Sequence, residues 1–219
     1  LFTSPHFVSP RERCCIDNTP ISQNDFAQCL IDIQPAITYV LKQQDRWGRL
    51  SFFELYTALS IYYFAQQEVD WSVIEVGLGG RLDATNIVQP ELSVITPISL
   101  EHQKVLGHTI ADIADQKAGI IKSRTPLILG PQPKSAESIF EKTAKHHQAP
   151  IIRVPIDLKI KEHHLNGQLF DFDSYSNLSI SLAGPYQPTN AATAVTAVQN
   201  LKLNQKLSPM AIEKGLAET

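Results

Sequence analysis

The sequence lacks several features that would place it outside the ordinary globular proteins. It has three cysteines, Cys14, Cys15 and Cys29, an odd number without repeated spacing, so a disulfide framework is excluded. Adjacent cysteines on a strand point to opposite faces, which argues against a metal shared by Cys14 and Cys15. No stretch approaches the roughly 20 apolar residues of a membrane span, and we expect no signal peptide, because no basic segment is followed by an apolar one. We expect a cytoplasmic protein in a reducing compartment, without a membrane partner.

An excess of basic charge is also missing. The 219 residues are 43% hydrophobic and 19% charged, with a net charge of −3. Nucleic-acid binding normally needs a basic surface, so we expect no nucleic-acid partner. The ordinary composition excludes a disordered or fibrous chain, and the length suffices for one substantial core. A weakly acidic chain can still bind nucleotides, because backbone N–H groups and metal ions hold phosphates locally.

Strands alternate with helices along the first 156 residues, which predicts an α/β fold with a mostly parallel sheet. Two capping boxes, Ser51 with Glu54 and Thr109 with Asp112, mark helix starts. Helices are also expected at 22–44, 136–146, 190–201 and 208–219. Two apolar runs predict strands buried on both faces, 71–76 and 91–98. Further strands are expected at 126–130 and 150–155.

The pattern changes after residue 156. The pair Asn166-Gly167 between strand-like flanks predicts a type I′ hairpin within a small antiparallel meander. Ser208 followed by Pro209 predicts the start of a last helix. The expected segments are therefore an α/β sheet part at 1–156, a meander at 157–183 and C-terminal helices at 184–219.

A glycine-rich stretch, V-I-E-V-G-L-G-G-R-L-D-A-T-N at 73–86, raises the question of a phosphate loop. A Walker loop needs a lysine and a hydroxyl after its last glycine, and this stretch has neither. A dinucleotide loop needs G-x-G-x-x-G, and Leu82 stands where the third glycine would be. Both phosphate-loop interpretations therefore fail here.

Three polar residues remain as site candidates. Glu75 is expected at the carboxyl end of a strand, where open α/β sheets bind ligands, and is either a metal ligand or a structural glutamate held by loop N–H groups or Arg81. His102 follows the next strand, and an imidazole beside a carboxylate suits a divalent metal, although a solvated surface histidine is the alternative. Lys117 shares a helix face with apolar residues, and it either snorkels or is held at a site with a perturbed pKa or a modified amine.

Taken together, these residues resemble a known family. The blocks that carry the resemblance are E-V-G-L-G-G-R-L-D-A-T-N, L-E-H-Q-K-V-L-G, K-A-G-I-I-K, F-T-S-P-H-F with R-E-R, F-F-E-L-Y-T-A-L-S and G-P-Y-Q-P-T-N-A-A-T-A. In this order and spacing they are similar to the dihydrofolate synthase / folylpolyglutamate synthase family of the Mur ligase superfamily. The resemblance covers nearly the whole chain and implies an incomplete Mur-type central ATP-binding domain with a P-loop-NTPase-like sheet.

The resemblance implies an ATP-dependent amide ligase acting on small molecules. ATP phosphorylates the carboxylate of dihydropteroate or of a folate, and the amino group of L-glutamate attacks the acyl phosphate. The cofactors implied are ATP and two Mg²⁺ ions, because phosphoryl transfer to a carboxylate brings anions together. We expect a monomer.

Family roles carry over to individual residues. Ser4 and Glu75 resemble ligands of one Mg²⁺, and His102 resembles a ligand of the second. Lys117 resembles a lysine that is carbamylated and helps to place that second metal. Substrate contacts on the pterin side are implied for Asp83 and for the loop made of Thr3, Ser4, Pro5 and His6. Asn190 and Gln187 resemble residues at the adenine end of ATP.

The sequence departs from the family pattern in places. Glu101 stands where the family more often has aspartate, and Tyr186 replaces the usual histidine. The G-T-N-G-K-G-S phosphate loop of the family, upstream of T-S-P-H, is not in these 219 residues, nor is a glutamate-binding domain. We therefore expect this chain by itself to bind Mg-ATP weakly or not at all. Two alternatives stay open: a non-catalytic pterin-binding or partner-binding homologue, and another Mur-type amino-acid ligase.

Overall fold

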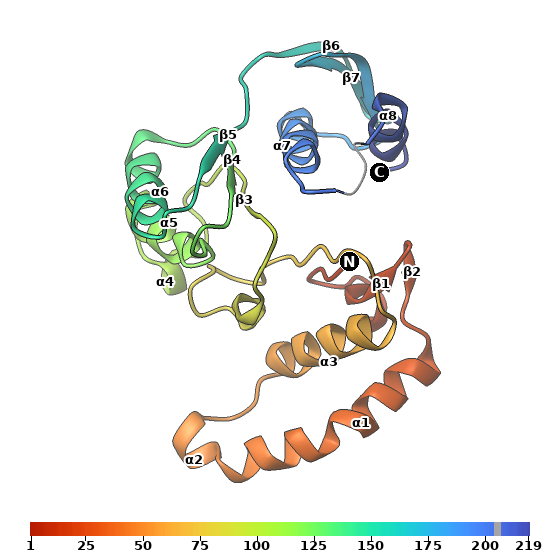
Figure 1. Ribbon diagram of the computed structural model, residues 1–219, viewed down its shortest axis with the longest axis vertical. Helices are drawn as coiled ribbons and strands as arrows, with labels where there is room; N and C mark the ends of the chain where they lie inside the picture. The colour runs from red at the N-terminus through yellow and green to blue at the C-terminus, as the bar shows by residue number, and fades with distance from the viewer. Residues whose placement is uncertain (204–206) are drawn as a thin grey trace. The chain divides into compact units, whose positions relative to one another are not determined.

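The computed structural model describes residues 1–203 and 207–219. The chain forms two compact units, 1–88 and 89–219, which are described separately (Figure 1). This boundary was not among those expected from the sequence. Among the described residues, no helix is long and apolar enough to cross a membrane.

The first unit is mainly helical. Two long helices, α1 (Gln23–Lys42) and α3 (Phe52–Gln66), pack together. The shorter elements are the 3₁₀-helices η1 (Pro10–Arg13) and η2 (Ala84–Ile87), the hairpin strands β1 (Cys15–Ile16) and β2 (Thr19–Pro20), and α2 (Gln44–Trp47). The core between them is lined by Phe2, Cys14, Ile21, Cys29, Tyr56, Leu59, Tyr63 and Phe64.

Local signals set where these helices begin. The Ser22 hydroxyl accepts a hydrogen bond from Asp25 N at 3.0 Å, so α1 starts directly after it. Both bonds of the predicted capping box at Ser51 and Glu54 are present at the start of α3. A cap of this kind contributes about 1 kcal/mol and needs only neighbouring residues.

The expectation of a strand buried on both faces at 71–76 is wrong. Ile74 forms only an isolated parallel bridge with Phe2, and the side chain of Val73 is 67% exposed. A strand is buried on both faces only when other strands flank it and side chains cover both sides. Among the described residues, Phe2 alone pairs with this segment.

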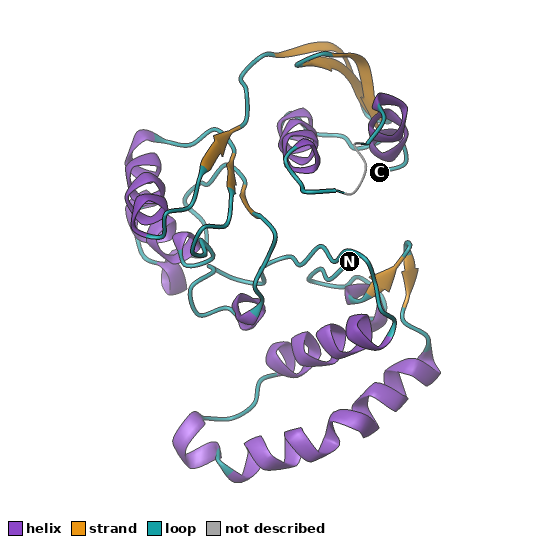
Figure 2. Ribbon diagram, viewed as in Figure 1, coloured by secondary structure: helices purple, strands orange, loops and turns teal. Residues whose placement is uncertain are grey.

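The second unit contains the predicted parallel sheet, in the order β3 (Ser93–Ile95), β4 (Leu127–Leu129) and β5 (Ile151–Arg153). On one face lie α5 (Ile110–Ala118) and α6 (Lys134–His146), which pack on each other, and the short α4 (Gln103–Leu106) contacts α5. On the other face lies α7 (Gln187–Gln199) (Figure 2). The predicted capping box opens α5, and Gly119 caps its end.

Burial differs along the sheet. Leu127 and Leu129 of β4 join the core beside α5 and α6, whereas Ile128 points into a second core with α7. The central strand is therefore buried on both faces. The edge strand β3 is not, which corrects the prediction for 91–98: Ser93 and Ile95 are buried, but Val94 is 38% exposed.

The antiparallel meander is present as β6 (Leu158–His164), β7 (Gly167–Phe172) and β8 (Tyr175–Ile180), and α8 (Pro209–Ala217) packs on β8. Ser208 caps α8 as predicted. The turn type was wrong: Leu165 and Asn166 form the loop, and neither has the positive φ that a type I′ turn requires. Gly167, with φ of 144°, opens β7 instead. The predicted fold class is confirmed.

Candidate functional site

The first group of predicted residues gathers at Glu75 in the 1–88 unit. Thr3 Oγ1 and Ser4 N both donate hydrogen bonds to Glu75 Oε2, the latter at 2.8 Å. Backbone pairing brings the segments together, because Phe2 N donates to Val73 O at 2.8 Å and Glu75 N donates to Phe2 O at 2.9 Å. Glu75 is exposed rather than buried. Glu75 thus has the loop N–H partner expected of a structural glutamate, and its carboxylate is also exposed to solvent, as a metal ligand would need.

The rest of the T-S-P-H loop is held by two residues of the R-E-R block, for which no individual role was predicted. Arg13 Nε donates to His6 Nδ1 at 2.8 Å, just after the cis peptide bond between Ser4 and Pro5. Glu12 accepts hydrogen bonds from the next three backbone N–H groups, those of residues 7–9. Those from Phe7 and Ser9 are the main reason that the pKa of Glu12 lies below its ordinary value. The S-x-x-E spacing of Ser9 and Glu12 is a capping box that could have been found.

Asp83 is used within its own loop. Its Oδ2 accepts from Leu78 N at 2.8 Å, and its Oδ1 accepts from Thr85 N at 2.9 Å and from the Thr85 hydroxyl. Asp83 therefore caps η2, and both of its carboxyl oxygens have partners in the same loop. Its predicted contact with a pterin stays a prediction.

Two glycines of the same loop have different reasons to be glycine. Gly79 has a φ of 74°, in the left-handed region that favours glycine. Gly77 has no such φ, but a Cβ there would lie 2.3 Å from Cζ of the Phe53 ring. The loop after Glu75 thus packs closely on α3 and does not form a phosphate cradle.

The second group lies in the 89–219 unit. Lys117 on α5 makes an ion pair with Glu101, with 3.2 Å between Nζ and Oε1 and side-chain exposures of 25% and 45%. His102, next to Glu101, caps α4 with backbone in the left-handed region, φ 49°, which is uncommon for a residue with a Cβ. The predicted apolar-face lysine is therefore held by a carboxylate beside His102, a pairing worth roughly 0–1 kcal/mol at this exposure.

The third group borders a cleft of about 500 Å³ in the same unit. Its lining comes from the carboxyl ends of β3 and β4 and from the start of α7: Thr96, Pro97, Pro131, Tyr186, Thr189 and Asn190. Asn190 Nδ2 donates to Gln187 Oε1 at 3.0 Å, so the two predicted nucleotide residues are in contact. Open α/β sheets bind ligands at this end of their strands.

Gln132, which the sequence did not mark, holds one wall of the cleft. Its Nε2 donates to Thr96 O at 2.9 Å, and its Oε1 accepts from Ile98 N at 3.3 Å. Nothing in the local sequence signals this role, because both partners lie more than 30 positions away.

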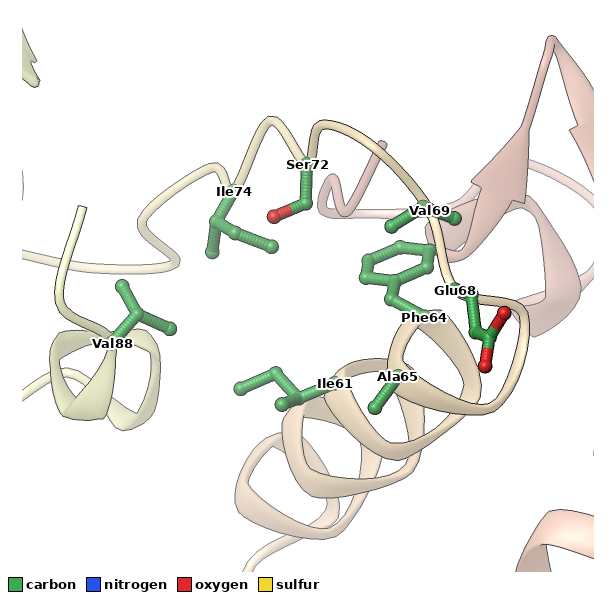
Figure 3. A pocket seen from close by; sticks show the side chains of 8 residues that line it. All are labelled: Ile61, Phe64, Ala65, Glu68, Val69, Ser72, Ile74 and Val88. Carbon is green, nitrogen blue, oxygen red and sulfur yellow. The ribbon is translucent and has the colours of Figure 1, made fainter. Parts of the chain in front are cut away.

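A second hollow, of about 260 Å³, lies in the 1–88 unit between α3 and the segment 68–74. Figure 3 shows Ile61, Ile74 and Val88 pointing toward one another across it. Its lining is apolar apart from Glu68 and Ser72, and it contains none of the predicted site residues. It offers space for an apolar group but no catalytic chemistry.

The donor atoms decide how well Mg²⁺ would fit. Glu75 and Ser4 offer the oxygen ligands that Mg²⁺ prefers. The ring of His102 is exposed and offers a nitrogen, a less usual partner for this ion. Among the described residues, no cluster of three or more His, Cys, Asp or Glu side chains forms a metal site. The oxygen group at Glu75 is thus the better fit.

The cysteines take no part in these groups. All three are free thiols, and burial raises the pKa of Cys14 to about 11. Burial also raises the pKa values of Cys15 and Cys29. Thiolate chemistry at neutral pH is therefore disfavoured at all three positions.

Comparison with known proteins identifies the fold family. The model of the Mur ligase middle domain matches residues 50–198. The chain belongs to the Mur ligase middle-domain family. Within this family its sequence is similar to the folylpolyglutamate synthase of Lacticaseibacillus casei, 36% identical over 99% of this chain. It is also similar to the dihydrofolate synthase/folylpolyglutamate synthase of Bacillus subtilis (strain 168), 33% identical over 99% of this chain. The predicted branch of the Mur ligases is confirmed.

Solved structures agree. A folylpolyglutamate synthase of Mycobacterium tuberculosis complexed with ADP matches 100% of this Mur ligase chain with a TM-score of 0.90 and 32% identity. A folylpolyglutamate synthase complex with AMPPCP and folate matches 99% of it with a TM-score of 0.88 and 35% identity. This chain covers 51% and 55% of those two chains, and 52% of each of the two curated relatives. It spans about half their length.

Proposed function

We propose that this chain carries part of the active site of an ATP-dependent ligase that adds L-glutamate to dihydropteroate, to folates or to both. In this reaction an acceptor carboxylate oxygen attacks the γ-phosphorus of ATP and ADP leaves. The glutamate amine then attacks the acyl phosphate, phosphate leaves and the amine loses a proton. The relatives are named for these activities, and two similar structures hold adenine nucleotides, one of them together with folate.

The observation that carries the proposal is the meeting of Thr3 and Ser4 with Glu75. Residues more than 70 positions apart in the sequence converge on one exposed carboxylate. Glu75 and the Ser4 hydroxyl would hold Mg²⁺, which supplies positive charge against the phosphate oxygens. Thr3 and the backbone N–H of Ser4 orient the carboxylate through Oε2.

The cleft at the start of α7 has a lining that suits a nucleotide base. Pro97, Pro131 and Tyr186 provide flat apolar surfaces, and Asn190 provides an amide that can pair with the edge of a purine. The contact with Gln187 Oε1 fixes the amide nitrogen of Asn190. These features fit the adenine end of ATP.

Lys117 is assigned to the second metal position in its carbamylated form. In the structure its ammonium group pairs with Glu101. A carbamate is an anion, so Glu101 would repel it, and the ion pair and the carbamate are alternatives. Observation of the carbamate carbon by NMR after incubation with ¹³C-bicarbonate tests this assignment, and Lys117→Ala provides the blank.

The proposed function is tested with the complete polypeptide encoded by the gene. It is incubated with Mg-ATP and labelled L-glutamate, with either dihydropteroate or tetrahydrofolate as the acceptor. We expect label in the acceptor and release of one ADP per amide formed. Binding of the pterin without label in either product would instead establish a non-catalytic binding protein. Turnover with neither acceptor, but with another carboxylate, would assign a different Mur-type reaction.

A further inference from the structure

Gln168 places a polar side chain on the buried face of the meander. It is 4% exposed and shares that face of β7 with Phe170 and Phe172, which are fully buried. An apolar side chain would pack at such a position without the need for hydrogen bonds. The amide must therefore be explained by its partners.

All three partners are present. Gln168 Nε2 donates to Leu182 O at 3.1 Å and to Gly184 O at 2.7 Å. Its Oε1 lies 2.9 Å from His163 Nδ1. Because both amide hydrogens are used on carbonyls, Oε1 is the acceptor and His163 carries its hydrogen on Nδ1. The side chain of Gln168 thus joins β7 to β6, through His163, and to the segment that follows β8.

The hydrogen bonds continue from Gly184 to the cleft. Gly184 O also accepts from Gln187 N at 3.1 Å, the first residue of α7. Gln187 Oε1 in turn accepts from Asn190 Nδ2, and Asn190 N donates to Tyr186 O at 3.1 Å. The bonds therefore run from β7 to the residues that line the cleft.

Gly184 allows this approach. Its φ is 120°, and a Cβ there would lie 3.2 Å from Cζ of Tyr186. The Tyr186 ring thus lies against the Gly184 backbone, whose carbonyl Gln168 holds. A shift of the Gly184 carbonyl would therefore also shift the backbone on which the Tyr186 ring packs.

We propose that Gln168 is a positioning residue for the cleft: it ties the irregular segment 182–186 to β7 and so places Tyr186 and Asn190. The effect of Gln168 on nucleotide binding rests on the proposed function, whereas its effect on the position of Tyr186 and Asn190 does not. β7 is the central strand of the meander, paired on both sides, and is a firm anchor. The meander, which contributes no residue to the cleft lining, thereby acquires a function.

The test replaces Gln168 with methionine, which keeps the length and removes all three hydrogen bonds. Lys161→Met is the matched control, because Lys161 also makes polar contacts within the meander, with Asp171 and Asn177, but none with the cleft. Amide hydrogen exchange of the 219-residue chain is followed residue by residue by NMR. Binding of ADP is measured separately, on the complete polypeptide encoded by the gene, by the shifts of the Tyr186 and Asn190 amides.

In the Gln168→Met variant we expect exchange at Gln187 and Asn190 to rise about tenfold, while Phe170 and Val195 stay within about twofold. A general loss of stability would raise all four rates together and would overturn the proposal. Unchanged rates at Gln187 and Asn190 would overturn it too. The Lys161→Met variant should leave all four rates as in the unsubstituted chain.

The ADP arm separates this proposal from the proposed function. ADP affinity should fall about fivefold to tenfold in Gln168→Met and stay constant in Lys161→Met. If ADP fails to shift the cleft amides of the unsubstituted complete polypeptide, the nucleotide assignment of the cleft fails and the exchange rates alone decide the role of Gln168. If ADP binds the variant and the unsubstituted chain equally well, the positioning role is rejected and the cleft assignment survives.

Discussion

Glu75 and Asp83 are two carboxylates of one glycine-rich stretch, only eight positions apart, and their surroundings differ in kind. Asp83 uses both oxygens on partners two to five residues away and closes its own turn. Glu75 receives both of its hydrogen bonds on Oε2 from a distant segment and remains exposed. A carboxylate whose oxygens are both used locally is part of the scaffold. One that is oriented from a distance and left open fits the metal-ligand role proposed for Glu75.

The largest expected effect comes from Glu75→Gln. The amide keeps the shape of the side chain but removes the negative charge that a cation needs. We expect ligase activity of the complete polypeptide to fall by at least about 10²-fold, as when one transition-state-stabilising group is removed. The urea midpoint should hardly change. Glu68→Gln, an exposed carboxylate of the same unit, is the control, and equal losses in the two variants would contradict the distinction.

Asp83→Ala should act on stability. It removes the cap of η2 and leaves Leu78 N and Thr85 N without their partner, at a cost of about 1–2 kcal/mol. Urea unfolding of the 219-residue chain measures this change. Asp83→Asn retains an acceptor oxygen and should lose less than half as much. A variant with unchanged stability but lost pterin binding would show that Asp83 binds the ligand and is not part of the scaffold.

Glu12 is a third carboxylate for this comparison, and its expected effect, on the pH dependence of stability, is the smallest. Its pKa is lowered below the ordinary 4.5, chiefly by the hydrogen bonds from Phe7 N and Ser9 N. Glu12 therefore binds its proton more readily in the unfolded chain. The free energy of unfolding rises with pH between the lowered pKa of the folded state and the ordinary pKa of 4.5. The contribution is complete above about pH 4.5 and is lost as the pH falls through the lowered pKa of the folded state.

Acid titration followed by NMR measures the Glu12 effect. The amides of Phe7 and Ser9 should lose their hydrogen-bonded shifts below pH 4.5, together with the titration of Glu12. Glu12→Gln should remove the titration and keep the loop amides insensitive to pH in this range. Shifts that persist in the glutamine variant would assign the transition to another group.

Features that depend on neighbouring residues could be predicted from the sequence. The capping boxes at Ser51 and Thr109 are examples, since each is closed within four residues. The predicted helices and the meander followed from local patterns, and the parallel sheet followed from the alternation of strands with helices. The turn at Asp83 could also be predicted from the D-A-T spacing, and the substrate contact of Asp83 stays a prediction.

Features that depend on distant partners could not be predicted. The runs 71–76 and 126–130 both predict strands, yet only the second is covered on both faces, because burial depends on what other segments supply. The ion pair of Lys117 with Glu101 and the clamps made by Gln132 and Gln168 join positions 14 to 36 apart in the sequence. The roles of Ser4, His102 and Asn190 remain predictions from the family.

The two-faced burial of β4 affects how the 89–219 unit unfolds. Leu127 and Leu129 complete one core and Ile128 completes the other, so the same three residues form a wall of both. Neither core can open without exposing this strand to water and weakening its neighbour. The helices on the two faces of the sheet should therefore melt together, as one cooperative unit.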